Sequence, residues 1–240
     1  TRHLENLPNF QFGIQVDSGM NRLGMEPHEW SAVASLALSS DPTLIMSHLA
    51  CADDPAHPQN ADQLSQFRAI TAGLDVPLSL AATGGTLLGP AFHFSMTRPG
   101  VGLYGGFPYS DAQAVVRLSL PVIQTREVAV GETVGYSASW RAERPSKIAT
   151  LSAGYADGIT RALSNAAILY AGDTPCPLAG RVSMDLLTVD VSHLDQMPSH
   201  LDLLCPAQTV DQVAELGGTI GYEILTSLGH RYERQYSGQE

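Results

Sequence analysis

The sequence predicts an α/β domain followed by an all-β domain, the first being part of a TIM-type (β/α)8 barrel. Up to about residue 112, apolar strand-like segments alternate with segments of helical period, an order typical of parallel βα units. From about residue 113 onward, strand-like segments follow one another with only turns between them, as in an all-β domain. We therefore expect two domains, residues 1–112 and residues 113–240, the second ending in two short helices.

Four segments of the first domain are predicted strands. Residues 10–16 alternate apolar and polar side chains with a period of two. The other three are short apolar runs at residues 43–49, 76–81 and 96–104, the last interrupted by Pro99 and Gly100. A closed eight-fold barrel needs roughly 250 residues. Four strand–helix units before residue 112 therefore correspond to half a barrel.

Two helices are predicted between these strands. Pro27 suits the first position of one helix, because a proline there leaves no hydrogen bond unmade. Its buried face is expected to contain Trp30, Val33 and Leu36. Asn60 and Gln63 have the spacing of a capping box, which predicts the start of the second helix.

The second domain is predicted to contain mainly strands. These are residues 115–122, 133–140, 148–151, 167–170 and 186–191. Near the C-terminus, residues 209–216 and 222–228 have the pattern of two short helices, the second ended by Gly229.

The composition excludes several classes of function. The formal net charge is -11, and the basic residues form no cluster, so we expect neither a nucleic-acid partner nor a membrane partner. No apolar run approaches the roughly 20 residues of a membrane span, and the chain begins at Thr1 as if within a longer sequence. The cysteines Cys51, Cys176 and Cys205 lack metal-ligand spacing, which predicts free thiols, a cytoplasmic location and no metal site.

Polar and basic residues follow the predicted parallel strands, at the end where ligands bind in βα architectures. Arg22, within DSGMNRLG, suits bidentate capture of a carboxylate or phosphate. His48 and Thr83 follow the next two strands, and a lone histidine is more often structural than catalytic. Arg98 lies close to Gly100, whose N–H can face a phosphate. Four successive strand ends thus indicate one polar site.

A second candidate lies in the β domain, where Tyr155 stands in the run SAGYADG. Because glycines lie on both sides of it, the backbone can turn there and approach a ligand closely. An isolated tyrosine at a glycine turn is usually a space-filling aromatic, so Tyr155 gains weight only from the other motifs.

Taken in order, these motifs resemble those of alanine racemases, which are fold-type III pyridoxal-phosphate enzymes. The resemblance runs from about residue 10 to Tyr236 and includes GRVSMD at residues 180–185 and TIGYE at residues 219–223. It implies an N-terminal eight-stranded barrel, of which strands five to eight are present here, a C-terminal β domain and a head-to-tail homodimer.

The resemblance also implies a role for each matching residue. Tyr155 would transfer the substrate α-proton on one face, within the partner's active site, with His48 and Arg98 as its hydrogen-bonded neighbours. Arg98 would also face the pyridine nitrogen of pyridoxal 5'-phosphate, and Arg22 would bind the substrate together with the main chain of Met184. The cofactor phosphate would be held by Thr83, Gly100, Val101 and Tyr222.

The sequence departs from the family pattern at three places. Gln15 stands where many members carry a lysine that positions the arginine equivalent to Arg22, and Ala82-Thr83 replaces the usual Asn-Ser. The family's cofactor lysine is absent, and Lys147, the one lysine of the sequence, is expected at the surface of the β domain. We therefore expect negligible activity from this chain alone, since the second acid/base residue is missing.

The implied reaction is the interconversion of L-alanine and D-alanine, which supplies D-alanine for peptidoglycan. Two alternatives stay open. One is a racemase acting on serine, lysine or another amino acid, and the other is a truncated, non-catalytic product. Half a barrel leaves strand edges unpaired, so we expect either association through them or poor solubility. The expected partner is a second copy of the chain, as the resemblance implies, or the missing N-terminal half.

Overall fold

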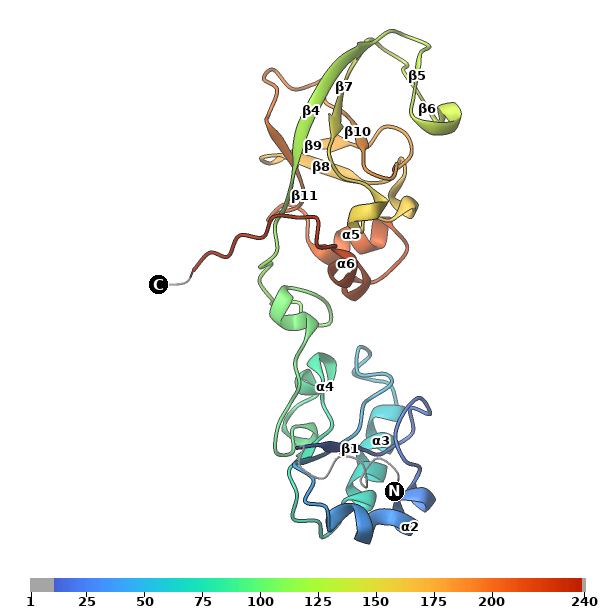
Figure 1. Ribbon diagram of the computed structural model, residues 1–240, viewed down its shortest axis with the longest axis vertical. Coiled ribbons are helices and arrows are strands. Elements are labelled where there is room, and N and C mark those ends of the chain that lie inside the picture. The colour runs from blue at the N-terminus through green and yellow to red at the C-terminus, as the bar shows by residue number, and fades with distance from the viewer. Residues whose placement is uncertain (1–10, 239–240) are drawn as a thin grey trace. The chain divides into compact units, whose positions relative to one another are not determined.

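The computed structural model describes residues 11–238, and their contacts divide them into two compact units. The N-terminal unit comprises the described residues up to Leu103 together with Pro108–Ser110. The C-terminal unit comprises Tyr104–Phe107 and the described residues from Asp111 onward. Figure 1 shows helices and short strands in the first unit and a larger sheet in the second.

The N-terminal unit contains a three-stranded parallel sheet in the order β1-β2-β3. Its strands are β1 (Gly13–Gln15), β2 (Leu44–Met46) and β3 (Leu78–Ser79). Ile14 pairs with Ile45, which pairs with Leu78. The three predicted parallel strands are confirmed, although each is shorter than expected, and residue 10 lies outside the described residues.

Two helices pack on this sheet, α2 (Pro27–Leu38) and α3 (Gln59–Ile70). Helix α2 begins at Pro27, as predicted. Trp30 is buried on its inner face, but Leu36 is 49% exposed and Ala37 is buried instead. The predicted face was therefore wrong in its last turn, where the helix keeps a small residue against the core.

The predicted capping box of α3 was wrong. The helix begins at Gln59, and the Asn60 amide donates to the carbonyl oxygens of Cys51 and Asp54, at 3.2 and 2.9 Å. The Gln63 side chain bonds the segments after β1 and β2 rather than the start of its own helix. Local spacing resembled a cap, but both amides are used to fasten neighbouring loops.

The fourth predicted strand, residues 96–104, was also wrong. Only an isolated parallel bridge joins Ala82 to Arg98, and Val101–Tyr104 forms a 3-10 helix, η2. Pro99 has no N–H to donate to a sheet. The segment between β3 and this bridge contains the short helix α4 (Thr83–Leu87) and the 3-10 helix η1 (Pro90–Phe92).

The C-terminal unit is built on a six-stranded antiparallel sheet in the order β10-β7-β4-β11-β8-β9. The strands are β4 (Leu118–Val128), β7 (Ser146–Leu151), β8 (Ile168–Ala171), β9 (Thr174–Pro177), β10 (Leu187–Asp190) and β11 (His200–Leu204). Figure 1 shows the long β4 running beside β7. Leu151, Leu169 and Leu201 lie in the core of this unit, removed from solvent.

Several predictions for this unit need correction. Residues 133–140 are not one strand but β5 (Thr133–Val134), the 3-10 helix η3 (Tyr136–Ala138) and β6 (Trp140–Arg141). Gly135, with φ of 75°, breaks the extended conformation there. Strands β9 and β11 were not predicted, because proline in one and charged or polar residues in the other hide the apolar pattern.

The two C-terminal helices are confirmed as α5 (Val210–Leu216) and α6 (Gly221–Ser227). Helix α5 has the capping box that α3 lacks, because the Thr209 hydroxyl accepts from the Gln212 N–H at 3.3 Å and the Gln212 amide oxygen accepts from the Thr209 N–H at 2.7 Å. Across residues 11–238, none of the helices combines the length and apolar character that a bilayer crossing requires.

Candidate active site

Arg98 is the centre of the polar site in the N-terminal unit. Its Nη1 donates to the Ser79 hydroxyl at 2.5 Å and its Nη2 donates to the Ser47 carbonyl oxygen at 2.8 Å. The same Nη2 lies 3.5 Å from Nδ1 of His48. Ser47 directly follows β2, and Ser79 is the last residue of β3. The ends of these two strands therefore hold the guanidinium. The predicted proximity of Arg98 and His48 is therefore present in the structure.

His48 is held in its neutral form. Burial lowers the pKa of the imidazole, and the positive charges of Arg98 and Arg22 lower it further. A guanidinium can only donate, so His48 Nδ1 accepts from Arg98 and the ring proton lies on Nε2. The site therefore offers a neutral N–H donor with a fixed tautomer.

Burial also lowers the pKa of Arg98, because this side chain is partly removed from water. The group remains a cation at neutral pH, since arginine titrates far above it. Its neutral hydrogen-bond partners leave the positive charge of the guanidinium available to an anion or an electron-rich ring.

Arg22 lies on a loop that is closed at both ends. The Asp17 N–H donates to the Met25 carbonyl oxygen at 2.8 Å, and the Met25 N–H donates to the Gln15 carbonyl oxygen at 3.0 Å. Gly24, with φ of 117°, allows this closure, because a Cβ there would lie 2.7 Å from the Val16 carbonyl carbon. The Arg22 loop, residues 17–25, thus returns to the strand from which it leaves.

Gln15 supports this loop by a single hydrogen bond, from its Nε2 to the Leu23 carbonyl oxygen at 3.1 Å. The amide therefore contacts the residue next to Arg22 along the backbone.

Thr83 organises the segment predicted to hold a phosphate. Its hydroxyl oxygen accepts from the N–H groups of Gly100 and Gly102, at 2.9 and 3.3 Å. A Cβ at Gly100 would meet nothing within 4 Å, so the space in front of this backbone is open. Thr83, Gly100 and the buried Val101 are therefore brought together, and their hydroxyl and N–H groups fit a phosphate that would share or replace the bond between them.

The two glycines after Thr83 have a packing role. A Cβ at Gly84 would lie 2.7 Å from the Ala52 carbonyl oxygen, and one at Gly85 would lie 2.9 Å from both Ala81 and Leu49. They let α4 approach its neighbours closely rather than give the loop freedom.

In the C-terminal unit, Tyr155 begins the 3-10 helix η4 (Tyr155–Asp157). Its N–H donates to the Ser183 carbonyl oxygen at 3.0 Å, and the Ala156 N–H donates to the Met184 carbonyl oxygen at 2.9 Å. Tyr155 and Met184 are 43% and 54% exposed. The structure thus joins the two predicted segments, and leaves both side chains facing outward.

Arg231 is a residue that the sequence did not indicate. Its Nε lies 3.2 Å from the Asp157 carboxylate and its Nη1 lies 2.7 Å from the Asp185 carboxylate. Asp157 belongs to η4 and also accepts from the Gly154 N–H at 2.9 Å. Arg231 therefore ties the turn of Tyr155 to the segment of Met184, through partners too distant in sequence for any motif to reveal.

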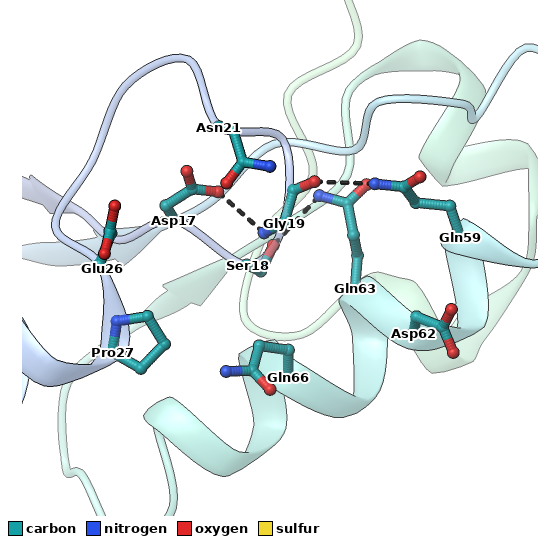
Figure 2. Close-up of a pocket in the computed structure, with 10 residues that line it drawn as sticks. All are labelled: Asp17, Ser18, Gly19, Asn21, Glu26, Pro27, Gln59, Asp62, Gln63 and Gln66. Atoms are coloured by element: carbon teal, nitrogen blue, oxygen red, sulfur yellow. Dashed lines mark hydrogen bonds between the residues drawn. The ribbon is translucent and has the colours of Figure 1, made fainter.

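A cavity of about 550 Å³ lies beside the Arg22 loop and between the first turns of α2 and α3 (Figure 2). Its lining is polar and consists of Asp17, Ser18, Gly19, Asn21, Glu26, Pro27, Gln59, Asp62, Gln63 and Gln66. The Asp17 carboxylate accepts from the N–H groups of Gly19 and Met20, at 2.8 and 2.9 Å. The sequence motif predicted the loop but not the amides of α3 behind it.

Two further predicted residues lie in the C-terminal unit. Tyr222 is in the first turn of α6 and is 45% exposed. Lys147 is on β7, with its ammonium 3.8 Å from the Glu127 carboxylate on the neighbouring β4. Lys147 is thus a partly exposed cross-strand partner, as its predicted surface position requires.

These features define a class of protein: a parallel α/β unit with an arginine–histidine site at its strand ends, followed by an antiparallel β unit that presents a tyrosine at a glycine turn. The family model described as "Alanine racemase, N-terminal domain" matches residues 2–108, and "Alanine racemase, C-terminal domain" matches residues 115–236. The chain belongs to the alanine racemase family.

Individual relatives agree with the family match. The alanine racemase of Dinoroseobacter shibae is 67% identical over 237 residues, which are 99% of this chain and 68% of the relative. That of Rhizobium meliloti is 44% identical over 94% of this chain and 65% of the relative.

Solved structures share the fold. The alanine racemase of Bartonella henselae, described with covalently bound pyridoxal phosphate, is 37% identical, with a TM-score of 0.89 over 98% of this chain and 70% of that chain. The biosynthetic alanine racemase of Pseudomonas aeruginosa is 40% identical, with a TM-score of 0.84 over 95% of this chain and 67% of that chain. The predicted combination of a barrel-like N-terminal domain and a C-terminal β domain is therefore correct.

Proposed function

We propose that this chain is part of a pyridoxal-phosphate-dependent racemase that interconverts L-alanine and D-alanine. The observation that carries the proposal is the Arg98–His48 pair at the ends of the parallel strands, with Arg22 close enough to lower the pKa of His48. Such a cluster combines two cations with one neutral donor, which suits an anionic cofactor and a substrate carboxylate.

Each residue of the pair has a distinct task. Arg98, held by Ser47 and Ser79, would face the pyridine nitrogen of the bound cofactor as a hydrogen-bond donor that does not give up its proton. His48 would present its Nε2–H to the phenol oxygen of Tyr155 from a second copy of the chain, and a donor there would stabilise the phenolate that acts as base. Arg22 pairs with the substrate carboxylate as a bidentate donor, together with the Met184 main chain.

Tyr155 would take and return the proton at the substrate Cα. Its partly exposed position lets it enter a site formed on a second copy of the chain, which supports the homodimer that the resemblance implies. The bound cofactor supplies the electron withdrawal that makes this proton acidic.

Thr83, Gly100, Val101 and Tyr222 would hold the phosphate of the cofactor. Thr83 supports this by drawing the Gly100 backbone beside open space. We also propose that β1, β2 and β3 belong to the second half of an eight-stranded barrel, with a domain boundary near residue 112. The free cysteines among the described residues suit a cytoplasmic enzyme.

The cofactor's attachment lysine would come from outside these 240 residues. Lys147 is the single lysine, and it pairs with Glu127 on an antiparallel sheet. Incubation with pyridoxal phosphate and borohydride should therefore label the full-length protein in wild type and in Lys147→Arg alike. Loss of labelling in Lys147→Arg would make Lys147 the attachment site.

The central test is turnover by the full-length protein with L-alanine, followed by circular dichroism and by exchange of the α-proton with deuterated solvent. Tyr155→Phe should lower kcat by about 10²- to 10⁴-fold, the usual contribution of a positioned acid or base. Tyr170→Phe, on β8 of the same unit, is the matched control and should change kcat less than twofold.

Other outcomes select between the alternatives. Turnover of serine or lysine in preference to alanine would identify a racemase of another substrate class. No exchange with any amino acid would favour the non-catalytic alternative, and an active Tyr155→Phe variant would remove Tyr155 from the mechanism.

A further inference from the structure

We propose that Gln63 is a positioning residue of this site, which fastens the Arg22 loop to the strand end that carries His48. The inference rests on the proposed function for its catalytic consequence, and on hydrogen-bond geometry for its structural part. Gln63 lies in the middle of α3 and is 1% exposed.

The Gln63 amide makes three hydrogen bonds to two separate segments (Figure 2 shows its orientation). Its Oε1 accepts from the Ala50 N–H at 2.8 Å, and its Nε2 donates to the His48 carbonyl oxygen at 2.9 Å. The same Nε2 donates to the Ser18 hydroxyl at 3.3 Å. One buried side chain therefore bonds the residues on both sides of Leu49 and the first turn of the Arg22 loop.

The two segments also contact each other directly. The hydroxyls of Ser18 and Ser47 lie 2.7 Å apart, at the ends of adjacent parallel strands. Gln63 completes this junction, because its three bonds need an acceptor and two donors on the same planar group. Among the side chains, only an amide of this length supplies both at once.

Precise placement matters because the Arg22 loop contains several residues in the left-handed region. Gly19 and Asn21, on either side of Met20, have φ of 123° and 56°. Gly24, two residues after Arg22, has φ of 117°. Such a loop has many alternative conformations once its anchors are removed. Besides Gln63, the anchor on this side is Gln59, whose Nε2 donates to the Gly19 carbonyl oxygen at 2.7 Å.

The electrostatics of His48 report this placement. The groups that lower the pKa of the imidazole, after burial, are Arg98 and then Arg22. Arg98 is held by the Ser47 carbonyl oxygen and the Ser79 hydroxyl, neither of which bonds Gln63 directly. A loop released by loss of the Gln63 amide would carry Arg22 away and admit water, and the pKa of His48 would then rise toward 6.5.

The experiment compares Gln63→Met with Gln66→Met in the full-length protein. Methionine has nearly the size of glutamine but makes none of the three bonds. Gln66 lies one turn further along α3, lines the same cavity and is exposed, so its substitution is the matched control (Figure 2). The two readouts are kcat and KM for alanine, and the titration of His48 by NMR of protein labelled with 15N-histidine.

We expect Gln63→Met to lower kcat/KM by about 10- to 100-fold, the effect of a displacement of about 1 Å, mainly through KM because Arg22 binds the substrate. It should also raise the pKa of His48, whereas Gln66→Met should change neither readout. A Gln63→Met protein that loses thermal stability alone, with kcat/KM and the His48 titration unchanged, would show a merely structural role and overturn the proposal.

A second variant covers the case in which Gln63→Met does not fold. Gln63→Glu keeps the size and the bond from the Ala50 N–H, but its ionised carboxylate cannot donate to His48 or Ser18 and lies near Asp17 and Asp62. When protonated it regains one donor. Its kcat/KM relative to wild type should therefore rise as the pH falls, and a ratio independent of pH would count against the proposal.

The two readouts also separate this inference from the proposed function. A wild-type protein without racemase activity would overturn the function, while the His48 titration would still test the placement of the loop. An active wild type with identical Gln63→Met and Gln66→Met variants would overturn the placement alone.

Discussion

His48 couples the chemistry of the site to the stability of the fold. Burial and the charges of Arg98 and Arg22 lower the pKa of the folded imidazole below the 6.5 of an unfolded chain. Between these two values the unfolded state binds more protons than the folded state, so the free energy of unfolding must fall as the pH falls. Above the unfolded value, His48 contributes no dependence on pH.

We therefore predict that His48→Asn reduces the loss of stability on acidification. Asparagine keeps an acceptor for Arg98 but does not titrate. The measurement is the free energy of unfolding in urea at pH 7.5 and pH 5.5, for wild type and for His48→Asn. An equal drop in both proteins would mean that other groups cause the acid sensitivity.

Gly158 closes the turn of Tyr155 and has no room for a side chain. Its φ is 96°, and a Cβ there would overlap the Ser227 carbonyl oxygen at the end of α6. Gly172, between β8 and β9, also has positive φ, but a Cβ there would meet nothing within 4 Å. The two positions thus share the backbone strain and differ in the clash.

We predict that Gly172→Ala costs about 1–2 kcal/mol, the strain of a left-handed alanine. Gly158→Ala should cost about 4 kcal/mol or more, because the backbone of η4 or α6 must move as well. Denaturant unfolding of both variants checks this. Equal losses of unfolding free energy in the two variants would show that the turn of Tyr155 accommodates a side chain at position 158 at no additional cost.

At the scale of elements, α5 supports the helix that carries Tyr222. The Asp211 carboxylate on α5 accepts from the Phe107 N–H at 2.8 Å, and Gly221 at the start of α6 packs against this carboxylate. Helix α5 has only seven residues, so its cap matters more than it would in a long helix.

Loss of this cap has a defined cost. We predict that Thr209→Ala lowers the free energy of unfolding by about 1 kcal/mol, since it removes the acceptor for the Gln212 N–H. Thr226→Ala, in the exposed part of α6, serves as the control. The Thr226 hydroxyl donates to the Tyr222 and Glu223 carbonyl oxygens of its own helix and does not cap a helix end. A cost below that of Thr226→Ala would contradict the role of the cap.

The comparison of these elements shows where sequence patterns succeed. Helices α2 and α5 were predictable because their first turns carry local signals, Pro27 and Thr209. Asn60 and Gln63 carry the same kind of signal, yet their amides bond distant loops, so tertiary partners decided the outcome. Residues 96–104 failed as a strand because Pro99 and the Thr83 hydroxyl favour a turn there.

The candidate site divides in the same way. Its charged and aromatic members were visible in motifs, since the chemistry itself needs Arg22, His48, Arg98 and Tyr155. The residues that hold them, Gln63 and Arg231, lie 13 or more positions from their partners and belong to none of the motifs of the site. Spatial contacts between such residues can be found only in the folded chain.

At the scale of the whole molecule, the sheet of the N-terminal unit has outer strands through which the chain could associate. Within the described residues, β1 and β3 each pair with β2 alone. Isolated bridges are formed beyond the ends of these strands by Val16 and by Ala82. The outer edge of β3 is occupied, because the Leu78 N–H donates to the Ser95 hydroxyl and the Leu78 carbonyl oxygen accepts from the Ser95 and Met96 N–H groups. Among the described residues, the outer edge of β1 is therefore the one that a further strand can bind. The strands of this sheet contribute Ile14 and Ile45 to the apolar cluster that also contains Phe67.

We predict that the 240-residue chain, expressed by itself, associates with increasing concentration. Contact between copies is favoured because the unpaired N–H and C=O groups at a free strand edge can form hydrogen bonds with a strand of another copy. Light scattering coupled to size-exclusion chromatography would show a mass above 25.5 kDa that rises with loading. A single monomeric species at all loadings would mean that the edges are covered within the chain, and would contradict the half-barrel proposal.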